Sequence, residues 1–426
     1  MNLPLQLLLA SLSSLSPRQR LWVAYSGGLD STVLLHALAE LASQGQLNQP
    51  LRAIHIHHGL SQHADAWQAH CAEHAARWGV VFESITVNAQ PKTGESPEAT
   101  ARNARYQAIA SQMNSGDLLL TGHHQDDQAE TLLIQLLRGS GVKGLAAMPH
   151  SHPFANGTLM RPLLACSRQV LQAYAEHHQL RWVEDESNNN DAYDRNFLRN
   201  QIIPQLQQRW PSVNATLSRS ASHCAQSAQL CDELAAQDLQ NIALNNLATL
   251  PVKAILTLNS ARQNNLLRYW ISNQKLPLPT TQQLQQITQL LTAKADTMPL
   301  VAWPGAELRR FAGKLYLMPP LTAHDASQVL AWPASQPSLT IESLGLTLQR
   351  SELTTAKDQD LQIRFRQGGE SIRLANKTHH TALKKLFQQY GVPPWQRNRL
   401  PLLYGEGEMI EIVGLTRRVA LSASMA

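Results

Sequence analysis

Short apolar runs alternate with amphipathic stretches over the first half of the chain. Between residues 20 and 185, the apolar runs have the length of strands, and the segments between them place apolar residues at helical spacing. The expected strands are 21–26, 51–58, 80–87, 117–124 and 179–185, and the expected helices are 32–41, 65–78, 96–113, 126–138 and 167–178. This alternation predicts an α/β fold with a doubly wound, mostly parallel sheet, whose loops after each strand share one edge.

The pattern changes beyond residue 186. Residues 187–212 are polar and rich in asparagine, whereas 213–295 carry a helical pattern interrupted by prolines. Residues 304–319 have the pattern of a strand pair, and 321–340 that of a linker. We therefore expect three domains: an α/β catalytic domain over 1–212, a mostly helical middle domain over 213–330, and a small α+β domain over 341–426.

Charge is distributed unevenly along the 426 residues. The net charge is +5, yet residues 361–426 alone hold ten Lys or Arg and four Glu. A basic terminal segment on a near-neutral body favours a polyanionic partner, nucleic acid first, although a solvated basic face would have the same composition. The four cysteines form no CxxC pair, which argues against a disulfide framework, a zinc ribbon and a cysteine-held iron–sulfur cluster.

The leucine-rich start of the chain resembles a secretion signal only superficially. No Lys or Arg precedes the leucines, and Pro4 interrupts them. No stretch reaches the roughly 20 apolar residues that span a bilayer. We expect a soluble, cytoplasmic protein without a membrane partner.

The motif SGGLDS, residues 26–31, follows the first expected strand and opens a helix. Gly27 and Gly28 allow a tight turn with bare N–H groups at the positive end of the helix dipole, which suits a phosphate. No GK[ST] follows, so this is not the lysine-bearing P-loop. Asp30 would be repelled by bare phosphate, and is therefore expected to hold Mg²⁺ or a cationic substrate. A helix capped by Ser or Asp after a glycine turn is the alternative.

Acidic residues open a second helix after the strand at 117–124. Asp126, Asp127 and Glu130 lie within the first turn, and His124 stands just ahead of them. Three carboxylates so close together repel one another, which predicts a cation between them, either Mg²⁺ or a substrate ammonium group. The alternative is that acidic residues simply complement the helix dipole.

Arginines occur at helical spacing in two further segments. Arg102 and Arg105 lie on the helix expected at 96–113 with Glu98, and Arg195 and Arg199 follow the asparagine-rich loop. Arginines can stabilise the charge that develops on a phosphate during transfer. Intrahelical ion pairs and Asx turns are the structural alternatives.

Together these motifs resemble the signature of the N-type ATP pyrophosphatases, the PP-loop family, which split ATP between the α and β phosphates. The resemblance implies a Rossmann-like domain that binds ATP and Mg²⁺. It implies ATP contacts at Ser26, Gly27, Gly28, Leu29, Asp30, Ser31, His57 and His124, with His57 in the segment AIHIHHGLS that seats adenine.

Within that family, the motifs are most similar to those of the tRNA(Ile)-lysidine synthetases. These motifs are SGGLDS, HIHHGLS, EATARNARY, GHHQDDQAETLLIQLLRGSGVKGLAAM and DESNNNDAYDRNFLRNQIIPQL, with a weaker match at 383–415. The resemblance implies ATP-dependent attachment of L-lysine to C2 of the wobble cytidine in an isoleucine tRNA with a CAU anticodon. The cytidine is first adenylated, and AMP and pyrophosphate are released. The product, lysidine, pairs with AUA instead of AUG and changes the tRNA identity from Met to Ile.

This chemistry assigns expected roles. A lysine amine has a pKa of about 10.4, so a carboxylate must hold the ammonium and accept its proton. Expected catalytic residues are Asp30, Asp127, Glu130, Arg102, Arg195 and Arg199, and Asp126 and Asp127 are the expected Mg²⁺ ligands. The middle and C-terminal domains are expected to bind tRNA, with Phe387, Tyr390 and Trp395 either stacking on bases or filling a core. A homodimer is left open, and tRNA thiolation, small-molecule amidation and non-catalytic tRNA binding are the rival functions.

Overall fold

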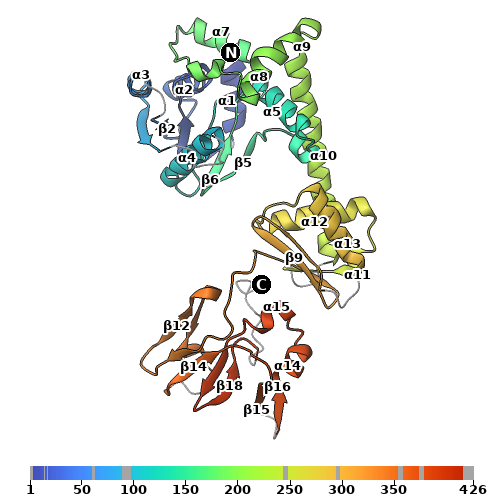
Figure 1. The fold of residues 1–426 in the computed structure, drawn as a ribbon. Helices are drawn as coiled ribbons and strands as arrows, with labels where there is room; N and C mark the ends of the chain where they lie inside the picture. The colour runs from blue at the N-terminus through green and yellow to red at the C-terminus, as the bar shows by residue number, and fades with distance from the viewer. Residues whose placement is uncertain are drawn as a thin grey trace. The chain divides into compact units, whose positions relative to one another are not determined.

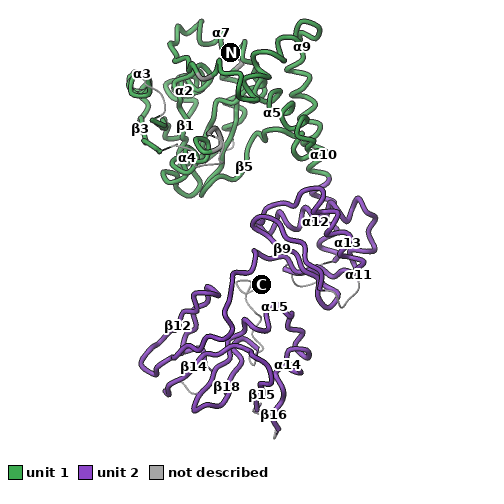
Figure 2. Tube along the Cα trace, viewed as in Figure 1, with its two compact units in different colours: residues 1–230 green, residues 231–426 purple. Residues whose placement is uncertain are grey.

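The computed structural model describes residues 3–13, 15–16, 18–59, 63–88, 97–242, 248–293, 298–353, 358–373 and 379–415. The chain divides into two compact units, residues 1–230 and 231–426 (Figure 2). The three-domain division drawn from the sequence stays a prediction, because the second unit holds both the middle and the C-terminal segments.

The first unit is built on a mostly parallel sheet (Figure 1). Its strands are β1 (Leu21–Ala24), β2 (Leu51–His57), β3 (Val81–Thr86), β4 (Leu118–Leu120), β5 (Ser151–Phe154) and β6 (Gly157–Met160). Among the described residues their order is β3-β2-β1-β4-β6-β5, and only β5 runs antiparallel to its neighbour. The predicted doubly wound α/β class is therefore confirmed.

Helices cover both faces of this sheet. Helices α1 (Leu3–Leu12), α2 (Leu29–Ser43), α3 (Ala64–Arg77) and α7 (Arg168–His177) pack on one face, and α4 (Pro97–Gln112) packs on the other. The further helices are α5 (Gln125–Leu137), α6 (Val142–Leu145), α8 (Asp194–Phe197), α9 (Ile203–Arg209) and α10 (Val213–Ile242). A 3₁₀ turn covers Glu186–Asn189, and a π-helical segment covers Leu198–Ile202. Helix α10 contains the point at which the two units divide.

Alternation along the strands explains the two layers. Leu21 and Val23 of β1 pack with α1, α2 and α7, whereas Trp22 packs on the other face with Ile109 of α4 and with Met113, which follows that helix. Successive side chains of a strand point to opposite faces, so a strand buried on both faces needs apolar residues at nearly every position. Burial on both faces therefore explains the near-continuous apolar runs in the sequence.

One of the expected strands is wrong. Residues 179–185 form no strand; they run past the end of the sheet, where Val183 N–H donates to the Gly27 carbonyl oxygen at 2.9 Å. This single hydrogen bond does not make residues 179–185 a strand of the sheet. The place beside β4 is taken instead by β6, which pairs with β5 as a hairpin that the sequence analysis did not predict.

The second unit begins within α10 and continues with helices α11 (Val252–Ile255), α12 (Ser260–Asn273) and α13 (Thr281–Thr292). They pack on the strands β7 (Thr249–Pro251), β8 (Leu300–Trp303), β9 (Ala306–Phe311) and β10 (Lys314–Met318). The strand pair expected at 304–319 is confirmed as β9 and β10, which pair antiparallel. Trp270 and Ile287 are fully buried between helices and sheet.

The rest of the second unit is rich in β structure. Its elements are β11 (Leu330–Trp332), β12 (Ser338–Ile341), β13 (Leu346–Gln349), β14 (Leu361–Arg364), β15 (Ser371–Arg373), β16 (His380–Ala382), α14 (Leu383–Gln389), α15 (Pro394–Arg397), β17 (Leu402–Gly405) and β18 (Glu408–Ile412). Residues 321–340, expected as a linker, contribute β11 and β12, which pair with β14 and β13. No helix among the described residues is long and apolar enough to cross a membrane.

Candidate functional site

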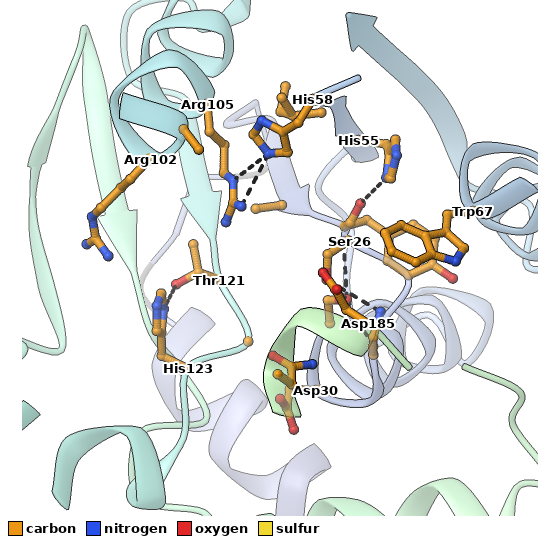
Figure 3. A pocket seen from close by; sticks show the side chains of 18 of the residues that line it. Ser26, Asp30, His55, His58, Trp67, Arg102, Arg105, Thr121, His123 and Asp185 are labelled. Carbon is orange, nitrogen blue, oxygen red and sulfur yellow. Dashed lines mark hydrogen bonds between the residues drawn. The ribbon is translucent and has the colours of Figure 1, made fainter. Parts of the chain in front are cut away.

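A cavity of about 730 Å³ lies in the first unit at the carboxyl ends of β1, β2 and β4 (Figure 3). We call it the large cavity. Its lining includes Ser26, Gly28, Asp30, Ser31, His55, His57, His58, Trp67, Arg102, Arg105, Tyr106, Thr121, Gly122, His123, Asp127, Asp185, Asn188, Tyr193, Arg195, Asn196 and Arg199. This edge of a doubly wound sheet is where such folds bind ligands, because the loops after the strands converge there.

The floor of the large cavity is the turn between β1 and α2. Gly28 is the N-cap of α2, and no side chain caps that helix, so the alternative of a Ser- or Asp-capped helix is not observed. The Ser26 and Ser31 hydroxyls lie 3.1 Å apart, and Ser31 Oγ donates to the Gly28 carbonyl oxygen at 3.1 Å. The first N–H groups of α2 thus have no side-chain acceptor and suit an anion.

Gly27 is held in a conformation that other residues adopt only at a cost. Its φ is +84°, and a methyl group added to its Cα would lie 2.8 Å from Sγ of Cys71, a buried residue of α3. Both the left-handed backbone and the close approach of α3 therefore require glycine.

We expect Gly27→Ala to destabilise the chain by about 1–3 kcal/mol and to weaken ATP binding by about tenfold or more, because the loop must shift to relieve strain and contact. Gly45→Ala is the matched control, since Gly45 has a φ of +69° but no atom within 4 Å of an added methyl group. Urea unfolding and ATP titration compare the two. ATP binding by Gly27→Ala equal to that of Gly45→Ala would contradict the expectation.

Asp30 lies in the first turn of α2 and faces the large cavity (Figure 3). Its Oδ2 is 3.5 Å from Nε2 of His124. Its Oδ1 is buried and has no hydrogen-bond partner among the described residues. A carboxylate oxygen that is buried without a donor suits a cation brought in with the ligand.

His124 links the two acidic helices. As N-cap of α5, its Nδ1 accepts the Asp126 N–H at 3.2 Å, while Asp127 Oδ2 accepts the N–H of His124 at 3.0 Å. A proton on Nε2 then faces the carboxylates of Asp30 and Asp127, at 3.5 and 3.4 Å. Burial alone would lower the pKa of His124, but Asp127 and Asp30 outweigh it and raise that pKa to about 9.

Two arginines lie against Asp127 and Glu130 of α5. Arg199 Nε donates to Glu130 Oε1 at 2.6 Å, and its Nη2 donates to Glu130 Oε2 at 2.9 Å and to Asp127 Oδ1 at 3.0 Å. Arg195 lies farther away, at 3.9 Å from Asp127 and 3.8 Å from Glu130. Two of the three carboxylates, Asp127 and Glu130, are thus paired with side chains of the same chain, while the expected Mg²⁺ or substrate ammonium group stays a prediction.

Arg199 owes its position to an irregular helix. It lies in the π-helical segment Leu198–Ile202, immediately before α9, whose second residue is Pro204. Proline has no N–H to donate to the carbonyl group four residues earlier, and its ring crowds that group, so the helix widens ahead of it. The widened turn directs Arg199 towards Asp127 and Glu130 on α5.

The pKa values of the two buried carboxyls are pushed in opposite directions. Burial alone would raise the pKa of Asp127, but His124, His123 and the arginines lower it below its usual range. Burial raises the pKa of Glu130 above its usual value, against the opposing effect of the Arg199 bond. Of the two groups, Glu130 is therefore the better proton acceptor.

The predicted site residues fall into two groups. The large cavity is lined by Ser26, Gly28, Asp30, Ser31, His57, Arg102, Asp127, Arg195 and Arg199. A small cavity of about 120 Å³ is lined by His124, Asp126, Glu130, Arg168, Arg199, Ile203, Pro204, Gln207 and Asn214. Gly27 lies where the turn passes close to Cys71 of α3, and the Leu29 side chain is buried in the core. The Glu98 side chain lies outside the described residues.

The proposed Mg²⁺ pair is not brought to one cavity. Asp127 lines the large cavity and Asp126 the small one, where Asp126 Oδ1 accepts the Arg168 N–H at 3.4 Å. Asp30, with its unpartnered oxygen, fits Mg²⁺ better, since this ion is commonly held by one or two carboxylates and the phosphates of its nucleotide.

Several lining residues were not singled out from the sequence. His58 Nε2 accepts from Nε and Nη2 of Arg105, both at 3.3 Å, and burial with Arg105 nearby lowers the pKa of His58 to about 4. His123 lies 2.8 Å from the Thr121 hydroxyl, and burial lowers its pKa to about 4 (Figure 3). Their position directly after a strand was the available signal, as it was for His57 and His124.

Three family models match successive segments of the chain. A PP-loop domain model matches residues 2–206, a TilS substrate binding domain model 250–316, and a TilS substrate C-terminal domain model 361–423. The tRNA(Ile)-lysidine synthase of Coxiella burnetii is 42% identical over 96% of this chain and 91% of its own length. That of Methylococcus capsulatus is 40% identical, over 94% and 93%. The chain belongs to the tRNA(Ile)-lysidine synthase family.

Membership of the tRNA(Ile)-lysidine synthase family confirms the resemblance drawn from the motifs. The PP-loop match covers every residue predicted for the site. Among solved structures, the U34-tRNA thiolase NcsA from Methanococcus maripaludis shares 18% identity over 52% of this chain and 77% of its own, and its TM-score of 0.43 is too low to support an inference.

Proposed function

We propose that this chain joins L-lysine to C2 of the wobble cytidine of an isoleucine tRNA with a CAU anticodon, at the expense of ATP, which becomes AMP and pyrophosphate. The observation that carries the proposal is one cavity in which an uncapped helix N-terminus, the carboxylate of Asp30 and the carboxylate of Asp127 converge, with Arg199 joining Asp127 to Glu130 of the small cavity. Its relatives, named tRNA(Ile)-lysidine synthases over nearly the whole chain, support it.

In the first step, the turn at Ser26–Ser31 would hold the pyrophosphate end of ATP through backbone N–H groups. His57, whose Nε2 is 3.0 Å from Asp65 Oδ1, lines the wall on which adenine is proposed to rest. The cytidine O2 attacks the α-phosphorus, and the bond from that phosphorus to the bridging oxygen breaks, releasing pyrophosphate. Arg102 and Arg195 face the same cavity and would stabilise the negative charge on the α-phosphate.

Mg²⁺, when bound, would neutralise charge on the phosphates. Asp30 is the residue proposed to hold it, because Asp127 already bonds to Arg199. His124 would help to position Asp30, because its Nε2 lies 3.5 Å from Asp30 Oδ2. Asp126 is a poorer candidate, because it lines the other cavity.

In the second step, the lysine amine attacks C2 of the adenylated cytidine, the C2–O2 bond breaks, and AMP leaves. Only about one amine in a thousand is unprotonated at pH 7, so the ammonium must first lose a proton. We assign its capture to Asp127, which lines the large cavity, and the acceptance of its proton to Glu130, which Arg199 joins to Asp127 and whose pKa is raised overall. Binding of the ammonium would have to loosen the bond between Arg199 and Glu130.

Thiolation, the nearest rival, lacks a suitable cysteine. Burial raises the pKa of Cys71 to about 12 and that of Cys166 to about 11, so neither thiol is reactive at neutral pH. Cys224 and Cys231 lie on α10, and no cysteine lines either cavity among the described residues.

Binding of tRNA is assigned to the second unit together with the cavity. Lys384 and Lys385 are exposed on α14, and Tyr390, 53% exposed, follows them. Phe387 is fully buried and belongs to the core, whereas Trp395 contacts Phe311 and Tyr316 edge-on. Of the three aromatic residues, Tyr390 is therefore the one we assign to stacking on RNA. A cytoplasmic location follows from the substrate, and the homodimer stays a prediction.

Mass spectrometry of nucleosides tests the function directly. An isoleucine CAU tRNA transcript is incubated with the chain, MgATP and isotope-labelled lysine, with methionine tRNA as the control substrate. We expect a cytidine that carries one labelled lysine, in amounts matched by AMP. ATP cleavage without an adduct would point to thiolation or amidation instead, and tRNA binding without cleavage would point to a binding protein.

A further inference from the structure

Two histidines and a glutamate meet on the sheet face that carries α2 and α7, helices that pack against each other (Figure 1). His36 and Glu40 are one turn apart on α2, and His178 is the C-cap of α7. One donor atom from each lies within 4.8 Å of the other two. Neither cavity is lined by any of the three, so the proposed reaction does not account for the cluster.

A tyrosine orients two of these side chains in advance. The Tyr174 hydroxyl donates to Glu40 Oε2 at 2.9 Å and lies 2.9 Å from Nδ1 of His36. Because the hydroxyl proton goes to the carboxylate, Nδ1 of His36 must carry the proton of the second bond. This tautomer leaves the lone pair of the ring on Nε2. A histidine whose other nitrogen is fixed by a hydrogen bond is the usual arrangement of a metal ligand.

Aromatic rings pack against the His36 side chain. Trp78 packs edge-on against its ring at 5.2 Å between centroids, and the His178 ring lies 4.9 Å away. These contacts restrict the His36 ring before any ion binds.

Other groupings of histidine in the described part of the chain are less complete. The rings of His70 and His74 lie 4.3 Å apart, and His57 pairs with Asp65 alone. Within those residues, no other set of three His, Cys, Asp or Glu side chains brings its donor atoms as close together. The carboxylates of the large cavity do not meet this criterion either.

We propose that His36, Glu40 and His178 form a binding site for a divalent transition-metal ion of the Zn²⁺ class. Two imidazole nitrogens and one carboxylate oxygen are a common protein ligand set for Zn²⁺, with water in the fourth position. Mg²⁺ prefers six oxygen ligands and would not compete. The ion would tie α7 to α2, the helix whose first residues follow the phosphate-binding turn.

The experiment uses the full, untagged chain after removal of metal ions. Co²⁺ is titrated while the visible absorption bands of tetrahedral Co²⁺ are recorded, and Zn²⁺ is then added in competition, with Mg²⁺ in large excess throughout. We expect one ion per chain, displaced by Zn²⁺ but not by Mg²⁺. We also expect Zn²⁺ to raise the midpoint of thermal unfolding by about 3 °C or more.

Two variants and a control locate the ion. His178→Ala and Glu40→Gln should each weaken binding by about tenfold or more and abolish the thermal shift. His177→Ala is the control, because His177 is an exposed neighbour on the same helix, and it should bind like the unchanged chain. Binding that survives in both variants, displacement by Mg²⁺, or no bound Co²⁺ at about 100 µM would each overturn the proposal.

Discussion

Asp30→Asn is expected to lower the rate of ATP-dependent tRNA adenylation by about 10²–10³-fold, while tRNA affinity stays within about twofold. The substitution keeps the size of the side chain but removes the charge that would face a cation beside the phosphates. The relevant atom is Asp30 Oδ1, which is buried in the large cavity wall without a protein donor. Pyrophosphate release in the presence of tRNA measures the reaction, and filter binding measures the affinity.

The control for Asp30→Asn is Glu73→Gln, which also turns a carboxylate into an amide in the same unit. Glu73 is 70% exposed and pairs with Arg77, at 3.7 Å on the same helix. It should adenylate at the unchanged rate. Adenylation by Asp30→Asn within about threefold of this control would show that Asp30 holds no essential cation.

Arg199→Met is expected to destabilise the first unit by about 3–5 kcal/mol, because it leaves two buried carboxylates without their closest counter-charge. The Glu130 side chain is only 1% exposed, and Arg195 is too far away to replace the lost hydrogen bonds. Urea unfolding at pH 7 measures the loss. Arg209→Met, an exposed arginine at the end of α9, is the matched control and should be within about 0.5 kcal/mol of the unchanged chain.

Two further measurements separate this electrostatic cause from a simple packing defect. Adding Glu130→Gln to Arg199→Met should recover part of the lost stability, because the amide needs no counter-charge. The deficit of Arg199→Met should also shrink as pH falls towards about 5. Because the pKa of Glu130 is raised in the folded state, Glu130 is protonated at low pH and needs no counter-charge. The cost of burying its ionised form without Arg199 appears only as pH rises. A deficit that is independent of pH and of residue 130 would contradict the role given to this pair.

The same pair of carboxylates shows where inference from the sequence ended. The i, i+3 spacing of Asp127 and Glu130 predicts a shared helix face and mutual repulsion, and both are present. Repulsion alone does not say what relieves it. The relieving group, Arg199, is 69 residues from Glu130 in the chain, and its direction depends on a π-helical turn before Pro204. No local pattern encodes that direction.

Strand prediction failed for a related reason. Residues 179–185 and 157–160 are both short and partly apolar, but only the second segment pairs with β4. Pairing depends on which backbone lies within hydrogen-bonding distance once the sheet has formed. In this chain the β5–β6 hairpin occupies that edge, with Gly157 so close to the Asp117 carbonyl oxygen that a methyl group there would clash.

The sequence by itself determined the class of fold, the edge of the sheet on which the candidate site lies and the turn proposed to bind phosphate, because each depends on local spacing: apolar runs, glycines after a strand and carboxylates in a first turn. The tertiary structure decided which charges meet. It placed the side chains of Asp126 and Asp127 in different cavities and paired Arg199 with Glu130. It also placed His178 beside His36, which is 142 residues away in the chain. Such pairings arise when distant helices pack on a common sheet, and their energies depend on burial and distance, which spacing along a chain does not contain.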